Sequence, residues 1–346
     1  MSTSSTEDPE DAPRAKGQGP RVKGCTSSTK DPEEATPAPG GTNISHLTRA
    51  QSLLQSLGKR PFKGLGQHFL VDSGILGKIV EEAHLSATDV VVEVGPGLGI
   101  LTLELAQRVS RVIAVELDAS LAELLRGTLS GFQNVTIVQA DILKVKPGEL
   151  VREPHADQER GRGAGEEGVP VEYKVVANLP YNIASPVLRL FLEDAAKPRV
   201  MLVMVQLEVA RRMTAKPGDM SQLAVGIQMY GHPTVVHTVS PRSFFPPPKV
   251  HSAIVRIEVY AKPAVDADPV PFFRVVRAGF SQPRKQIRNS LAAGLSLKPD
   301  DAVSVLSRAG IDPQRRAQTL SLAEWGAVTA SSLDFFSRHG NFSPIH

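Results

Sequence analysis

Four consecutive residues, Asn178-Leu179-Pro180-Tyr181, combine groups that suit chemistry on an amine. The exocyclic amine of adenine is a poor nucleophile because its lone pair is delocalised into the ring. An Asn carbonyl and a neighbouring main-chain carbonyl can accept both amine hydrogens, which localises that lone pair. Pro180 fixes φ and removes a main-chain donor, while Tyr181 offers a face on which a base can stack. An ordinary Pro-containing turn with an Asn cap is the alternative.

A glycine-rich segment, Gly95-Pro96-Gly97-Leu98-Gly99, follows the Val-rich run at 90–94 and precedes a helical pattern that begins near Leu101. Glycines let the main chain approach a ligand closely, and the start of a helix presents unpaired N–H groups. A dinucleotide fingerprint would need Gly-x-Gly-x-x-Gly, but residue 100 is Ile. NAD is therefore disfavoured, and the pattern predicts another nucleotide-like ligand.

Two further strand patterns each deliver an acid. Glu116 ends the pattern at 111–117 and can accept hydrogen bonds from both ribose hydroxyls of a nucleoside. Asp141 follows the next pattern, at 135–141, and can receive an adenine amino group, although capping the following turn is its alternative role. Because open α/β sheets bind ligands outside the carboxyl ends of their strands, these loops predict one shared site for a nucleoside cofactor.

The composition excludes several protein classes. With 346 residues, 41% of them hydrophobic, the chain can bury a substantial core and form more than one domain. It has neither an eighteen-residue apolar run nor an apolar leader, so we expect no membrane span, no signal peptide and a cytoplasmic location. The single cysteine, Cys25, excludes a disulfide framework, and the nine histidines form no tight cluster, so we expect no metal site. A monomer is the default expectation.

Charge is distributed unevenly along the chain. Residues 199–346 hold 18 Lys and Arg against 10 Asp and Glu, a net of 18 − 10 = +8, whereas the whole chain is only +3. This asymmetry favours a polyanionic partner, with a solvated basic face as the alternative.

The chain divides into four parts. We expect a disordered tail at 1–43, a short helix and linker at 44–62, a doubly wound α/β domain at 63–263 and a small all-α domain at 264–346. Residues 152–170 are a Gly-rich, charged insertion. The strands are expected near 90–94, 111–117, 135–141, 173–179, 199–207, 233–240 and 253–260, the last two as an antiparallel pair at one edge. Helices are expected at 272–280, 284–293, 300–309 and 322–336.

Basic residues are concentrated at the start of the helical part. Between Pro269 and Pro299 there are six basic residues and no acidic one, and Arg284, Lys285 and Arg288 lie in or beside the expected helix at 284–293. Such a stripe fits phosphate contacts, since ordinary helix surfaces mix both signs of charge.

From about Lys63 to Phe336 the chain resembles the ribosomal RNA adenine dimethyltransferases of the bacterial kasugamycin-sensitivity type, which have relatives in eukaryotes. The ordered motifs that carry the resemblance are Lys63-x-x-Gly66-Gln67-His68-Phe69-Leu70, Glu93-x-Gly95-x-Gly97-x-Gly99, Glu116, Asp141, Asn178-Leu179-Pro180-Tyr181, Gln206-x-Glu208-Val209-Ala210-x-Arg212, Phe244-x-Pro246-x-Pro248-x-Val250-x-Ser252, Phe280-x-x-x-Arg284-Lys285-x-Ile287-x-Asn289 and Arg316-Ala317. Two positions depart from the family pattern, which usually has Asn at 68 and Glu at 318.

The resemblance implies a Rossmann-like class I methyltransferase sheet. It places S-adenosylmethionine against His68, Leu70, Gly95, Glu116, Asp141 and Asn178. The implied substrate is a pair of adjacent adenosines near the 3′ end of small-subunit (16S) rRNA in an immature subunit, each methylated twice without a metal. Asn178 and Pro180 would polarise the amine and Tyr181 would stack on the base, while Phe244 or Phe245 would cover its other face or, alternatively, pack in the core.

Two competing functions share parts of this pattern. A large-subunit rRNA methyltransferase of the antibiotic-resistance type has the same glycine loop and Asn-x-Pro-Tyr motif, but residues 244–252 and Arg284-Lys285 favour the small-subunit enzyme. A non-catalytic ribosome-assembly, RNA-binding or transcription factor is the second alternative. Retention of Glu116, Asp141 and the Asn178 motif argues against loss of activity.

Overall fold

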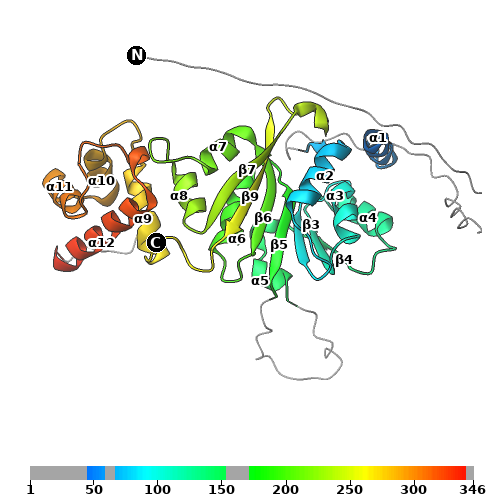
Figure 1. Ribbon diagram of the computed structural model, residues 1–346, viewed down its shortest axis with the longest axis horizontal. Coiled ribbons are helices and arrows are strands. Elements are labelled where there is room, and N and C mark those ends of the chain that lie inside the picture. The colour runs from blue at the N-terminus through cyan, green and yellow to red at the C-terminus, as the bar shows by residue number, and fades with distance from the viewer. Residues whose placement is uncertain (1–44, 59–66, 153–170, 340–346) are drawn as a thin grey trace, which may run out of the picture. The chain divides into compact units, whose positions relative to one another are not determined.

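The computed structural model describes residues 45–58, 67–152 and 171–339 (Figure 1). The tail expected at 1–43, the linker after residue 58 and nearly all of the insertion expected at 152–170 lie outside these residues.

A seven-stranded sheet forms the centre of the described chain, in the order β4-β3-β2-β5-β6-β9-β7 (Figure 1). Neighbours among β2 to β6 pair in parallel, whereas β9 runs antiparallel to both β6 and β7. The expected doubly wound sheet with an antiparallel edge pair is confirmed. The strands are β2 (Val90–Val94), β3 (Arg111–Glu116), β4 (Val135–Gln139), β5 (Tyr173–Asn178), β6 (Val200–Gln206), β7 (Gly231–Val239) and β9 (Ser252–Val259).

Alternate residues of the strands face two separate cores. Val92 and Val175 face one large core that includes helix α6 (Ala184–Glu193) and continues into the C-terminal helices. Val91 and Val176 face the other, which is covered by α2 (Ser73–Glu82) and α3 (Ile100–Ala106). Buried on both faces, β2, β3, β5 and β6 are mostly apolar runs, as their sequence indicated, whereas the edge strand β4 is only partly buried.

The remaining helices complete the layers. The helix expected between residues 44 and 57 is present as α1 (His46–Ser56), and its Ala50 and Leu54 pack in a small core with Phe69 and Leu121. The other elements of the α/β part are α4 (Ala119–Thr128), α5 (Pro147–Leu150), α7 (Leu207–Met213), α8 (Gln222–Gln228) and the 3-10 turns η2 (Ile142–Lys144) and η3 (Pro241–Ser243). None of the described helices combines the length and apolar character needed to cross a bilayer.

A second, two-stranded sheet was not expected from the sequence. It pairs β1 (Phe69–Leu70) with β8 (Phe244–Phe245), with Leu70 opposite Phe244 and Phe69 opposite Phe245. Two-residue strands carry no periodicity that a sequence pattern can reveal. This small sheet joins residues 67–72, here called the strap, to the Pro-rich loop at residues 241–248.

The C-terminal part is helical, as expected. It contains α9 (Pro269–Gly279), α10 (Ile287–Leu295), α11 (Pro299–Arg308), the 3-10 turn η4 (Ala317–Thr319) and α12 (Leu322–His339). The expected helix start at 284 is wrong, because α10 begins at Ile287. The main-chain N–H of Ile287 donates to Arg315 O at 2.7 Å, so the segment between α11 and η4 satisfies this N–H group at the start of the helix.

Candidate active site

The glycine loop joins β2 to α3 and adopts a conformation that only glycine accepts readily. Gly95, Gly97 and Gly99 have φ values of +67°, +59° and +77°. A Cβ on Gly97 would lie 3.0 Å from the Phe69 ring, and one on Gly95 would lie 3.4 Å from the Pro180 ring. The glycines therefore permit three motifs that are distant in sequence to meet: the strap, the glycine loop and the loop after β5.

Glu116 stands at the end of β3 and is only 7% exposed. Its Oε2 accepts the Gly97 N–H at 3.1 Å, and its Oε1 accepts the Asp118 N–H at 2.9 Å. Burial raises the pKa of Glu116, and these two main-chain donors oppose the rise. The carboxylate is thus held rigidly beside the glycine loop, with lone pairs left for a ligand's hydroxyl groups.

Asp141 follows β4 and performs the capping role that the sequence left open. Its Oδ1 accepts the Leu143 N–H at 3.1 Å at the start of η2, and its Oδ2 lies 3.8 Å from Lys144 Nζ. The same residue also lines the cavity described below. Capping fixes the carboxylate but does not use all its acceptor positions, so the two roles are compatible.

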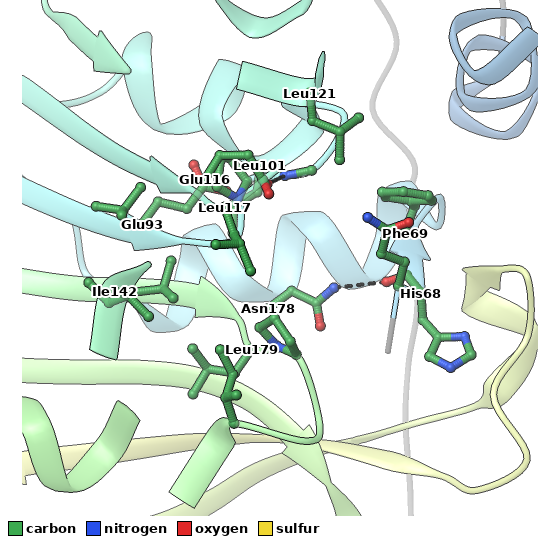
Figure 2. A pocket seen from close by; sticks show the side chains of 18 of the residues that line it. His68, Phe69, Glu93, Leu101, Glu116, Leu117, Leu121, Ile142, Asn178 and Leu179 are labelled. Carbon is green, nitrogen blue, oxygen red and sulfur yellow. Dashed lines mark hydrogen bonds between the residues drawn. The ribbon is translucent and has the colours of Figure 1, made fainter. Parts of the chain in front are cut away.

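The Asn178 amide is oriented by the strap. Asn178 Nδ2 donates to His68 O at 3.1 Å, which leaves Oδ1 as the end of the amide without a hydrogen bond to any described residue (Figure 2). The Pro180 carbonyl accepts the Ile183 N–H at 3.1 Å and keeps one lone pair. Two carbonyl oxygens of one loop thus remain able to accept amine hydrogens.

Most of the predicted site residues line one cavity of about 240 Å³. Its walls include every residue predicted for the cofactor and for catalysis: His68, Leu70, Gly95, Glu116, Asp141, Asn178, Pro180 and Tyr181. These residues come from the strap and from the ends of β2 to β5, the edge at which open α/β sheets bind ligands.

Glu93 is a cavity residue to which the sequence assigned no role. It is 2% exposed on β2, and its Oε2 has no hydrogen-bond partner among the described residues. Burial raises its pKa to about 8, a hydrogen bond with the Thr102 side chain opposes the rise, and the negative charge of Glu116 adds to it. A buried carboxyl oxygen without a partner is costly, so Oε2 is suited to a ligand that carries a cation or a donor.

Apolar residues that follow the two acids also line the cavity. Leu117 comes directly after Glu116, and Ile142 and Leu143 follow Asp141. Leu117 is 53% exposed and Leu143 is 39% exposed, so both side chains keep surface for contact with a ligand. The signal that was available in the sequence is their position, one or two residues beyond an acid at a strand end.

Neither phenylalanine of the Pro-rich loop lines the cavity. Phe244 is 3% exposed and packs with Leu70 in the core, which is the alternative role that the sequence left open for it. Phe245 is partly buried opposite Phe69. Of the two rings, only Phe245 retains surface for another contact.

The basic triplet (Arg284, Lys285 and Arg288) lies apart from the residues that line the cavity. Arg284 and Lys285 belong to the turn before α10, and Arg288 belongs to its first turn. All three side chains are exposed, and none has an ion-pair partner within the described chain. Unneutralised, exposed guanidinium and ammonium groups are suited to phosphate contacts. Among the described residues no group of three or more His, Cys, Asp or Glu side chains could hold a metal ion.

Comparison with known proteins decides the family. The model of the ribosomal RNA adenine dimethylase family matches residues 59–330. The chain belongs to this family. A ribosomal RNA small subunit methyltransferase A from Dehalococcoides mccartyi is 44% identical over 282 residues, covering 81% of this chain and 91% of the relative. Another from Pelotomaculum thermopropionicum is 44% identical over 288 residues, covering 82% and 95%.

Two solved structures of methyltransferases share the fold of this dimethylase-family chain. The 23S rRNA methyltransferase ErmE has a TM-score of 0.57 and 28% identity, covering 76% of this chain and 98% of its own. A dimethyladenosine transferase from Plasmodium falciparum has a TM-score of 0.62 and 23% identity, covering 79% and 98%. The Rossmann-like class I methyltransferase sheet and the C-terminal helical part are therefore as expected.

Proposed function

We propose that this protein is an S-adenosylmethionine-dependent rRNA adenine-N6 dimethyltransferase that dimethylates two adjacent adenosines near the 3′ end of small-subunit rRNA during ribosome biogenesis. The observation that carries the proposal is the convergence of the glycine loop, Glu116, Asp141 and the Asn178 loop on one cavity. Membership of the dimethylase family and 44% identity to small-subunit enzymes support it.

The residues of the cavity fit S-adenosylmethionine, which supplies a methyl group on a cationic sulfur when it is bound. Glu116 is fixed to accept ribose hydroxyls, and Asp141 keeps an acceptor for the adenine amine. Leu70 and the exposed Leu117 offer apolar walls, and Gly95 brings main chain against the ligand. The Glu93 carboxyl, whose Oε2 has no hydrogen-bond partner among the described residues, suits the cationic end of the cofactor.

Catalysis then comes from orientation and polarisation rather than from an acid or a base. Asn178 Oδ1 and the remaining lone pair of the Pro180 carbonyl accept the two hydrogens of the target amine, which localises its lone pair toward the methyl donor. Tyr181 provides the stacking face for a base that has left its helix or loop. Holding the amine in line with the donor supplies the rest.

RNA recognition is assigned to the C-terminal helical part. The basic triplet is exposed and lacks acidic partners, which favours contacts with RNA phosphates. Phe245 remains the candidate of the two phenylalanines for a contact with the substrate, and Phe244 serves the core. We also retain the division into an α/β domain at 63–263 and a helical RNA-binding domain at 264–346 as a proposal.

The alternatives are less well supported. The 23S rRNA methyltransferase ErmE is only 28% identical, against 44% for the small-subunit enzymes. Retention of Glu116, Asp141 and the Asn178 motif in one cavity argues against a non-catalytic assembly factor. We further propose that the substrate is the immature small subunit, and that the protein acts as a cytoplasmic monomer without a metal, since a methyl sulfonium needs no Lewis acid.

Transfer of labelled methyl from S-adenosylmethionine to unmethylated small ribosomal subunits tests the proposal. We expect label on two neighbouring adenosines near the rRNA 3′ end, mapped as dimethyladenosine. Large subunits prepared in the same way are the matched control. Label on the large subunit alone would support the antibiotic-resistance type of enzyme, and cofactor binding without transfer would support an assembly factor.

A further inference from the structure

The side chain at position 68 faces away from the cofactor acids and toward the Pro-rich loop (Figure 2). His68 Nδ1 lies 2.7 Å from Pro246 O, and the imidazole is stacked on the Tyr181 ring with centroids 5.5 Å apart and planes inclined by 30°.

The register of the small sheet explains why the two residues meet. Phe69 lies opposite Phe245 and Leu70 opposite Phe244, so the next antiparallel pair would be 68 and 246. Pro246 has no N–H with which to continue the ladder. The His68 ring makes the contact instead, and since a carbonyl oxygen only accepts, Nδ1 carries the proton and donates. This bond fixes the plane of the imidazole.

Tyr181 is held at a second point. Its hydroxyl lies 2.6 Å from Ser252 Oγ, and Ser252 is fully buried at the start of β9. The phenol therefore has its far end anchored on the sheet and one ring face covered by His68. These two contacts set the plane of its ring before any substrate arrives.

The main chain of the same residue acts on the second catalytic group. His68 O accepts Asn178 Nδ2 at 3.1 Å, which determines which end of the amide is free to accept from the target amine. The imidazole and the carbonyl of one residue thus contact the stacking ring and the polarising amide. Both His68 and Tyr181 line the cavity and are only partly buried.

We propose that His68 is a positioning residue for the target adenine: its imidazole, fixed by Pro246, backs Tyr181 and directs the base onto the opposite face of that ring. The inference rests on the proposed function and goes beyond it, because it moves the His68 side chain from the cofactor to the target side of the site. Only the main chain of residue 68 remains available to the cofactor.

Pre-setting an aromatic platform changes rate through orientation. Aromatic pairs contribute about 0.5–1.5 kcal/mol beyond their buried area, so losing the backing ring should lower kcat/KM for rRNA about three- to tenfold. Affinity for S-adenosylmethionine should stay within about twofold, since none of the contacts of the imidazole involves a cofactor residue.

The test compares three variants in the full-length protein. His68→Ala removes the ring, and His68→Phe keeps a ring on Tyr181 while losing the bond to Pro246. His232→Ala, which alters an exposed histidine on β7, is the matched control. For each we would measure kcat/KM with small subunits, the Kd of S-adenosylmethionine by calorimetry, and Tm. We expect His68→Ala to lose activity, His68→Phe to recover most of it, and the control to match the wild type.

A double-mutant cycle separates positioning from a general structural role. If His68 acts through Tyr181, the effect of His68→Ala should vanish in a Tyr181→Ala background, whereas a structural defect would add to it. Faster turnover by His68→Ala would mean that the imidazole occupies the position of the target base. Weaker binding of S-adenosylmethionine would mean that the imidazole contacts the cofactor. Either of these results would overturn the inference. Additive effects of the two substitutions, or an inactive His68→Phe variant, would also overturn it. Absence of methyl transfer by the wild type would instead refute the proposed function.

Discussion

Removing the charge of Glu93 should stabilise the cofactor-free protein at neutral and alkaline pH. Glu93 is 2% exposed on β2, and burial raises its pKa from the ordinary 4.5 to about 8. A raised pKa means that the folded state binds more protons than the unfolded state between these two values. The contribution of protonated Glu93 to the free energy of unfolding is therefore fully present below pH 4.5 and is lost as the pH rises toward 8. The Glu93→Gln variant lacks this loss.

The size of the effect follows from the two pKa values. One pKa unit corresponds to about 1.4 kcal/mol, so Glu93→Gln should gain roughly 3 kcal/mol relative to wild type between pH 5 and pH 8. Urea unfolding of both proteins across this range measures it, and taking their difference cancels all other titrating groups. Glu123→Gln, which changes a carboxylate that is 80% exposed on α4, is the matched control.

The cofactor provides the second half of this experiment. If Glu93 meets the cationic end of S-adenosylmethionine, the variant should bind it more weakly, and wild-type affinity should rise with pH as the carboxyl group ionises toward pH 8. A stability difference that stays constant within about 1 kcal/mol from pH 5 to pH 8 would refute a buried, protonated Glu93. Equal cofactor affinity would refute its role as a ligand.

Three other substitutions test separate parts of the site. Asn178→Ala should abolish methyl transfer and leave RNA binding nearly unchanged, and normal turnover in a transfer assay would remove Asn178 from the mechanism. Replacing the basic triplet with Gln should weaken rRNA binding and flatten its salt dependence by a slope of about 0.7–0.9 per lost phosphate contact; an unchanged slope in a filter-binding titration would place the RNA face elsewhere. Gly97→Ala puts a Cβ 3.0 Å from the Phe69 ring at a φ of +59°, so calorimetry should show weaker cofactor binding. Gly127→Ala, an exposed helix position with open space, should bind normally and be more stable by up to about 1 kcal/mol.

The sequence determined the sheet and most of the cavity for a simple physical reason. Parallel strands buried on both faces must be apolar runs, and the carboxyl ends of such strands meet at one edge. Glu116 and Asn178 end buried runs of this kind, and Asp141 follows the less buried edge strand β4, so their convergence could be predicted without knowing any distance. The antiparallel pair β7 and β9 was equally visible, because no helix pattern separates the two strands.

No sequence pattern indicated that Glu93 and the leucines that follow the two acids line the cavity. A Glu inside a Val-rich strand is conspicuous, yet its burial, missing partner and raised pKa depend on the helix α3 that covers it. The start of α10 likewise depended on Arg315, a residue beyond α11 whose carbonyl accepts a hydrogen bond from the Ile287 N–H. Local patterns carry no information about such partners.

The strap shows both what the sequence could determine and what required the tertiary structure. The sequence alone predicted that residues 67–70 belong to a methyltransferase motif and that residues 178–181 hold amine-binding groups. Only the tertiary structure decided that β1 pairs with β8, that Phe244 packs in the core, and that the His68 ring lies between Pro246 and Tyr181. Strand periodicity and motif spacing are local properties of a chain, whereas the partner of a two-residue strand, and the direction in which one imidazole points, are set by contacts between segments more than a hundred residues apart.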